Sequence, residues 1–202
     1  MLECLLNNGN VQSGRFFGLP RHAKVKGSAW SSGSVNYLLE GNASITEEGS
    51  LIISDNISAL SMTFSDGLNL DASEDWYLEL EIKGSFSGSS NNVFVCGAWP
   101  SEVYFQIQYY RNAIYTYFAG PYRIGPTVHL LSIPQSNHIV WQSRSGMHEI
   151  WVNGSLNHTL DRRSVSLKIP VGDRLELPMR KDGNFNGQYL QVNLVKGQLR
   201  YP

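Results

Sequence analysis

The sequence has little of three features that would define its class at once: cysteine, net charge and long apolar runs. Its 202 residues include two cysteines, Cys4 and Cys96, which excludes a disulfide framework and a cysteine-rich metal site. Sixteen basic and seventeen acidic residues give a net charge of −1, so we expect no nucleic-acid partner. No apolar run approaches the roughly 20 residues that cross a bilayer, so we expect no membrane insertion.

A secretory signal pattern is also lacking. Residues 1–20 open with a short apolar stretch, which Glu3 and the polar residues 7–10 interrupt. Cysteines in a reducing cytoplasm remain free thiols. We therefore expect assembly of this chain in a cytoplasm.

Alternation with a period of two residues is abundant, whereas sustained helical periodicity is absent. Alternating apolar and polar residues occupy 76–83, 165–169, 174–179 and 190–195, and 93–96 is apolar on both faces. One apolar and one wet face per strand is typical of antiparallel sheets packed face to face. The sequence therefore predicts an all-β, antiparallel two-sheet sandwich.

Turn signals separate these segments. Asn153-Gly154 is among the strongest hairpin signals, because Asn and Gly reach positive φ at low cost. The other predicted turns or loops are 48–49, 66–67, 84–92, 120–121, 182–183 and 186–187.

One domain is the natural interpretation at this length, since all-β sandwiches of about 200 residues are often undivided. We predict that residues 41–202 form the sandwich. Residues 1–40 are basic, rich in Gly and Ser and weakly patterned. We interpret them as an N-terminal arm or irregular lead-in that packs on the sandwich or on another subunit.

Two stretches near the end carry a family resemblance. Residues 137–154 read NHIVWQSRSGMHEIWVNG, and residues 185–202 read FNGQYLQVNLVKGQLRYP. Together they resemble the laminin-G-like, concanavalin A-like jelly roll. The closing KGQLRYP is similar to the ending of such domains on tailed-bacteriophage virion proteins. The chain departs from the family at Ser136-Asn137, where a tryptophan is usual before the histidine position.

The resemblance implies a non-enzymatic virion surface protein that decorates the tail or the capsid. It implies host-surface carbohydrate or other virion proteins as partners, and a homo-oligomer. Two alternatives remain open: a glycan-active enzyme of the same fold, and a free-standing lectin of a bacterium or host.

The sequence has few of the residue patterns that an enzyme active site would need. Glycoside hydrolysis requires two facing carboxylates, and the nearest candidate is Glu79 with Glu81. The third acid of jelly-roll glucanases is absent, so we interpret this pair as the solvated face of an outer strand. The five histidines lack metal-binding spacing, and no Gly-x-Ser-x-Gly elbow is present. We therefore predict no catalytic residues.

No cofactor is predicted. Residues 182–187 resemble a calcium loop in their alternating oxygen ligands, but the closing glutamate is missing. Asp66, Asn69 and Asp71 form a weaker version of the same pattern. A turn explains residues 182–187 better, and structural calcium is kept only as an alternative.

The most informative candidate site is aromatic. Residues 103–110 and 114–118 are two expected strands joined by a short connection, and alternation gives each a face that bears Tyr. Aromatic rings stack on sugars, and amides bond sugar hydroxyls, while Tyr is also enriched at interfaces. We predict a glycan platform or a subunit interface; the alternative is tyrosines that merely cap the sheet. The predicted residues are Tyr104, Gln106, Gln108, Tyr110, Tyr115 and Tyr117, with Trp99 and Tyr122 at the rim.

Overall fold

The computed structural model describes the strands and most turns of the chain. The described residues are 14–19, 27–32, 34–71, 73–87, 90–98, 102–110, 113–118, 123–129, 136–161, 167–169, 174–178 and 184–202. In these ranges every regular element is a β-strand. No helix in the described part of the chain is long and apolar enough to cross a membrane.

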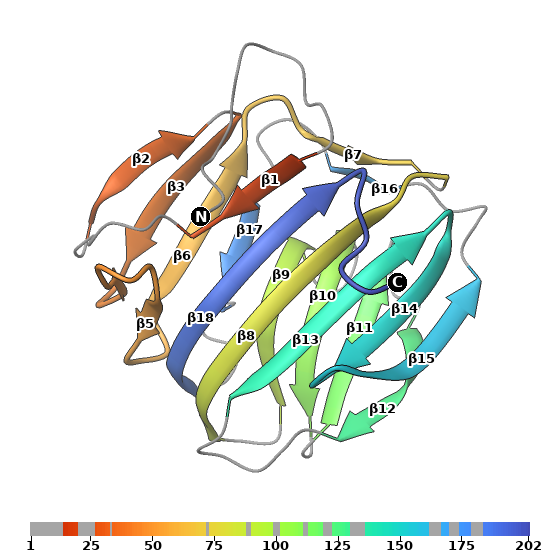
Figure 1. The fold of residues 1–202 in the computed structure, drawn as a ribbon. Coiled ribbons are helices and arrows are strands. Elements are labelled where there is room, and N and C mark those ends of the chain that lie inside the picture. The colour runs from red at the N-terminus through yellow and green to blue at the C-terminus, as the bar shows by residue number, and fades with distance from the viewer. Residues whose placement is uncertain are drawn as a thin grey trace.

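The first sheet, sheet A, faces the viewer in Figure 1. Its strands follow the order β15-β14-β13-β8-β18-β5-β4, and β1 also pairs with β18. All of its pairings are antiparallel. The bounds are β1 Gly14–Gly18, β4 Ser44–Ile45, β5 Leu51–Ile53, β8 Trp76–Ser87, β13 Asn137–Arg144, β14 Met147–Val152, β15 Ser155–Asp161 and β18 Asn184–Lys196.

The second sheet, sheet B, lies behind the first (Figure 1). Its order is β12-β11-β10-β9-β17-β6-β3-β2, and β7 and β16 form a separate two-stranded sheet. The bounds are β2 Ala29–Ser32, β3 Val35–Glu40, β6 Ala59–Phe64, β7 Leu68–Leu70, β9 Ser90–Ala98, β10 Glu102–Tyr110, β11 Ala113–Phe118, β12 Arg123–His129, β16 Leu167–Ile169 and β17 Arg174–Leu177. The predicted two-sheet sandwich is confirmed.

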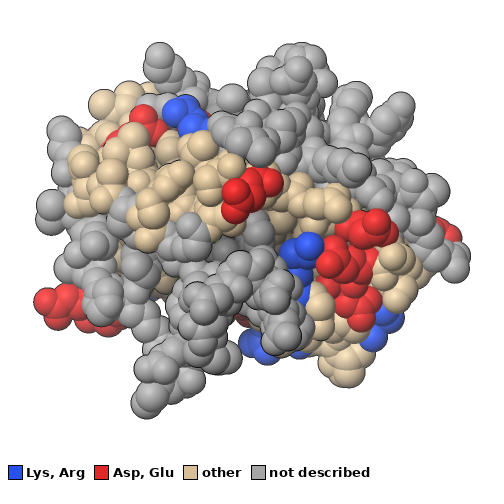
Figure 2. All heavy atoms as spheres, turned by 90° about the horizontal axis from the view of Figure 1, so that it is seen from above, with Lys and Arg blue, Asp and Glu red and all other residues tan. Residues whose placement is uncertain are grey.

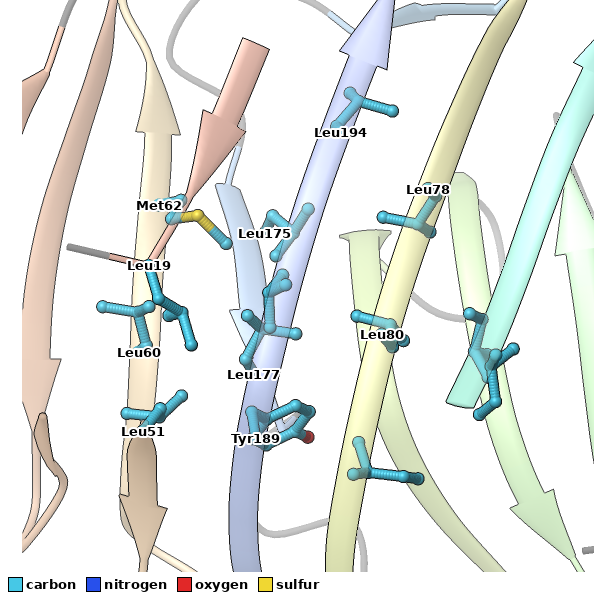
Figure 3. Close-up of a cluster of buried hydrophobic side chains, with 14 of the residues drawn as sticks. Leu19, Leu51, Leu60, Met62, Leu78, Leu80, Leu175, Leu177, Tyr189 and Leu194 are labelled. Carbon is cyan, nitrogen blue, oxygen red and sulfur yellow. The ribbon is translucent and has the colours of Figure 1, made fainter. Parts of the chain in front are cut away.

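The core fills the space between the sheets. Leu78 and Leu80 of β8 and Leu194 of β18 point towards Leu175 and Leu177 of sheet B (Figure 3). These residues take alternate positions along their strands, as the sequence pattern predicts. Strands β3 and β14 show the same alternation, with one buried face and one more exposed face.

One hairpin confirms its predicted turn signal, and a second hairpin has the same geometry. Asn153 and Gly154, with φ of 51° and 81°, join β14 to β15. Ser145 and Gly146, with φ of 47° and 85°, join β13 to β14. Positive φ at both central residues matches the right-handed twist of the strands that they connect.

The predicted turn at residues 186–187 is wrong, and so is most of the predicted loop at 84–92. Strand β8 continues to Ser87, and Gly187 lies inside β18 directly opposite Gly84. A Cβ on Gly187 would lie 2.6 Å from Cα of Gly84. The two glycines therefore allow a close approach of neighbouring strands, a role of strand glycine that resembles a turn signal in sequence.

The described parts of residues 1–40 are built into the sandwich. Strand β1 pairs with β18, and β2 and β3 extend sheet B. Val35, Tyr37 and Leu39 are buried in the core. The interpretation of residues 1–40 as an irregular lead-in did not anticipate this strand, because its alternation extends over only six residues.

Charges are mixed on the surface. On the face seen from above, Lys and Arg lie beside Asp and Glu at two places (Figure 2). This arrangement agrees with the net charge of −1 and offers little steering of polyanions.

Candidate functional site

The predicted tyrosine platform lies on strands β10 and β11 of sheet B. Their antiparallel register places Gln106 opposite Tyr117 and Gln108 opposite Tyr115. Residues directly opposite in such a pair share one face of the sheet. The backbone therefore brings these predicted residues together, while their role in binding stays a prediction.

This face of β10 is turned away from the core. Ile107 belongs to the core cluster, so alternation places Gln106 and Gln108 on the other side of the strand. Gln106 is 0% exposed, whereas Gln108 is half-buried. Of these two glutamines, Gln108 is therefore the more accessible to a ligand.

The structure describes only some of the remaining predicted site residues. Tyr104 and Tyr110 lie in β10, whereas Trp99 and Tyr122 lie outside the described residues. Asp182 of the candidate calcium loop also lies outside them. The described ranges contain no group of three His, Cys, Asp or Glu that could hold a metal ion.

The outer face of sheet A carries a second, unpredicted polar site. Four adjacent strands contribute to it, and the segment after β18, residues 197–202, crosses over them (Figure 1). We call these six residues the closing segment and the residues beneath it the outer-face cluster. The cluster comprises Glu79 of β8, His138, Gln142 and Arg144 of β13, Glu149 and Trp151 of β14, and Gln191 and Asn193 of β18.

Glu79 lies at the centre of the outer-face cluster and is 2% exposed. Its Oε1 atom lies 2.8 Å from Nε2 of His138 and 2.8 Å from Nε of Arg200. Its Oε2 atom accepts hydrogen bonds from the amides of Gln191, at 2.6 Å, and Asn193, at 2.9 Å. A buried carboxylate is stable only when it is paired and hydrogen-bonded in this way.

The closing segment is bound by side chains of the cluster. Oε1 of Gln142 accepts the backbone N–H groups of Arg200 and Tyr201 at 3.1 and 3.0 Å. Nε2 of Gln142 and an NH2 of Arg144 each donate to the carbonyl of Tyr201 at 3.2 Å. The Tyr201 ring stacks on Trp151 with centroids 4.4 Å apart and planes 19° apart.

The surroundings of Glu79 stabilise its ionised form. Burial raises the pKa of Glu79, but hydrogen bonds from His138, Arg200 and Asn193 and the charge of Arg200 outweigh it, lowering the pKa to about 2. The same contact raises the pKa of Arg200. A general acid for glycoside hydrolysis needs a raised pKa instead, so Glu79 is unsuited to that role.

The interpretation of Glu79 and Glu81 as the solvated face of an outer strand is therefore wrong. Strand β8 lies in the middle of sheet A, and the closing segment covers its outer face at Glu79. A sequence signal was present: Glu79, His138 and Gln142 occupy polar positions of strands whose other face is apolar. An Arg in the closing segment then supplies the countercharge.

The molecule is thus a two-sheet jelly-roll sandwich with one predicted platform and one occupied polar cluster on its outer faces. No protein-family model matches the sequence, and no curated protein matches it. Solved structures do match.

The structural neighbours include binding domains of botulinum neurotoxins. One is the serotype D ligand-binding domain in complex with N-acetylneuraminic acid, at 11% identity, with a TM-score of 0.67, covering 92% of this chain and 48% of that one. Another is the binding domain of neurotoxin DC in complex with rat synaptotagmin II, at 11% identity, with a TM-score of 0.63, covering 90% and 48%. The chain thus spans about half the length of these structures, and the likeness shows a shared fold.

Proposed function

We propose that this chain is a non-enzymatic binding module that recognises carbohydrate through strands β10 and β11. The observation that carries the proposal is the register that sets Gln108 opposite Tyr115 on the face away from the core. Tyrosine rings stack on sugars and glutamine amides bond sugar hydroxyls, so these two residue types suit a carbohydrate site. Gln108 is partly exposed and so is accessible to a ligand.

The structural neighbours support a binding role. One of them is described as a ligand-binding domain with N-acetylneuraminic acid and another as a complex with synaptotagmin II. One description names a complex with a sugar and the other a complex with a protein. The low pKa of Glu79 supports the same proposal, because this carboxylate is unsuited to act as the general acid of glycoside hydrolysis.

We further propose that the module acts on the surface of a tailed-phage virion, as a homo-oligomer beside other virion proteins. Support comes from the closing KGQLRYP and its resemblance to the endings of such virion domains. Mass spectrometry of purified phage particles tests whether the chain is part of the virion. The identity of the neighbouring genes is a second test. Absence of the chain from the particles would contradict it.

Glycan-array binding of the purified chain tests the main proposal. Substitution Tyr115→Ala or Gln108→Ala is expected to lower glycan affinity at least ten-fold, since each removes one of the two contacts. The matched control is Leu38→Ala, because Leu38 is 40% exposed on β3 of the same sheet and is separated from β10 by three strands. It is expected to leave binding unchanged.

Three outcomes contradict this assignment. Equal binding by all variants would remove the platform from β10 and β11. Dissociation of an oligomer by Tyr115→Ala, without any glycan binding, would make the platform a subunit interface. Time-dependent release of reducing ends from a bound polysaccharide would show an enzyme.

A further inference from the structure

The closing segment is attached to sheet A in the manner of a bound peptide. The N–H of Gly197 donates to the carbonyl of Asp75 at 2.7 Å. Among the described residues, no main-chain to main-chain hydrogen bond of this segment follows it. From Gln198 onwards the segment is held by side chains of the outer-face cluster. None of these contacts depends on the covalent link to β18.

One set of contacts recognises the peptide backbone. Gln142 is 0% exposed, and its amide group meets three backbone groups of a single dipeptide: it accepts the N–H of Arg200 and of Tyr201 and donates to the carbonyl of Tyr201. Arg144 adds a second donor to that carbonyl. A buried amide with both of its ends engaged selects a bent dipeptide whose two N–H groups point the same way.

A second set of contacts recognises the two side chains. The buried carboxylate of Glu79 accepts from Nε of Arg200 at 2.8 Å, which selects a cationic donor. The indole of Trp151 stacks on the ring of Tyr201, and the tyrosine hydroxyl lies 3.4 Å from Nδ1 of His138. The order Arg before Tyr matters, because the carboxylate that binds Arg200 and the indole that stacks on Tyr201 lie on different strands.

We propose that the outer-face cluster is a peptide-binding site for an Arg-Tyr dipeptide, with the closing segment as its resident ligand. A partner protein that presents the same dipeptide takes the place of this segment. Gly197, with φ of 72°, provides the point about which the segment turns away while β18 stays paired. This site is on sheet A, so it is independent of the carbohydrate platform proposed on sheet B.

Peptide binding to the full chain tests the proposal. The host is the variant Arg200→Ala/Tyr201→Ala, which keeps the closing segment and empties both side-chain positions. The probe is a fluorescein-labelled heptapeptide with the sequence of residues 196–202, and the control probe has its Arg and Tyr exchanged. We expect saturable one-to-one binding of the probe by fluorescence anisotropy, at least ten-fold tighter than binding of the control probe.

Three further comparisons sharpen the test. The unsubstituted chain should bind the probe at least ten-fold more weakly than the host, because its own segment competes. Adding Glu79→Gln or Trp151→Leu to the host should weaken binding at least ten-fold, whereas Glu81→Gln should not. Glu81 is a suitable control because it lies on the same face of β8, two residues further on.

Circular dichroism confirms that each host is folded, and Tyr201→Ala alone serves as a second host that retains the Arg200 contact. The proposal is overturned if a folded host binds neither peptide or binds both equally. It is also overturned if the unsubstituted chain binds the probe as tightly as the host.

Discussion

Both faces of strand β8 are buried, but by different kinds of contact. On the inner face, Trp76, Leu78 and Leu80 are 1%, 1% and 0% exposed and pack against apolar neighbours. On the outer face, Glu79 is 2% exposed and is stabilised by hydrogen bonds and charge. Two equally buried faces of one strand therefore differ in chemistry, since one is apolar and the other carries a charge.

The two faces should respond differently to substitution of their residues. The inner face depends on volume and shape, so truncation leaves a cavity. The outer face depends on complete pairing, so removal of one member leaves polar groups unpaired. Substitutions of the two kinds should differ in size and in their dependence on pH.

The largest effect is expected at the inner face. Trp141 is fully buried, its ring centroid lies 6.0 Å from that of Trp76, and its indole N–H donates to Nδ1 of His148 at 3.3 Å. Trp141→Ala should lower the free energy of unfolding by about 4 kcal/mol, measured by urea denaturation. The outer-face change Trp151→Ala should cost about half as much. Equal losses would contradict the distinction between the faces.

Glu79→Gln should have the next largest effect. The neutral amide loses the charge that pairs with Arg200, and in either orientation its NH2 group faces donors, those of Arg200 and His138 or those of Gln191 and Asn193. The expected cost is about 3 kcal/mol in urea denaturation. Glu81→Gln, on the same face of the same strand, should change stability by less than about 0.5 kcal/mol. Similar losses for the two variants would show that burial of Glu79 has no special electrostatic cost.

The inner face of β8 could be predicted well from the sequence. Alternation at residues 76–83 and 190–195 located β8 and β18, and Asn153-Gly154 located a hairpin. These are local signals, since side-chain direction and turn geometry depend on neighbouring residues. They suffice to predict the sandwich and the core positions of these strands.

The outer face could not be predicted in the same way. The partners of Glu79 lie 59 to 121 positions away in the chain, so their contact depends on strand order and register. A slip of one residue would turn every side chain to the opposite face. The platform on β10 and β11 was easier to propose, because its two strands are neighbours in sequence, but burial of Gln106 required the whole fold.

Acid should weaken the outer face selectively. The pKa of Glu79 is lowered from 4.5 to about 2, so the folded chain holds the proton less tightly than the unfolded chain. Stability from this group is present above pH 4.5 and is lost as pH falls towards 2, by at most about 1.4 kcal/mol per pH unit and about 3 kcal/mol in total. Urea midpoints at several pH values should show this slope, and Glu79→Gln should reduce it. An unchanged slope in that variant would assign the acid sensitivity to other carboxylates.

The smallest expected effects separate stacking from hydrogen bonding at Tyr201. Tyr201→Ala removes the ring that stacks on Trp151 and should cost about 1 kcal/mol. Tyr201→Phe keeps the ring and loses only the hydroxyl that lies 3.4 Å from His138, so it should cost less than about 0.5 kcal/mol. Urea denaturation measures both, and tryptophan fluorescence reports whether the ring still covers Trp151. If Tyr201→Phe is as damaging as Tyr201→Ala, the hydroxyl rather than the ring holds the closing segment, and the outer face then relies on polar contacts even where it has an aromatic pair.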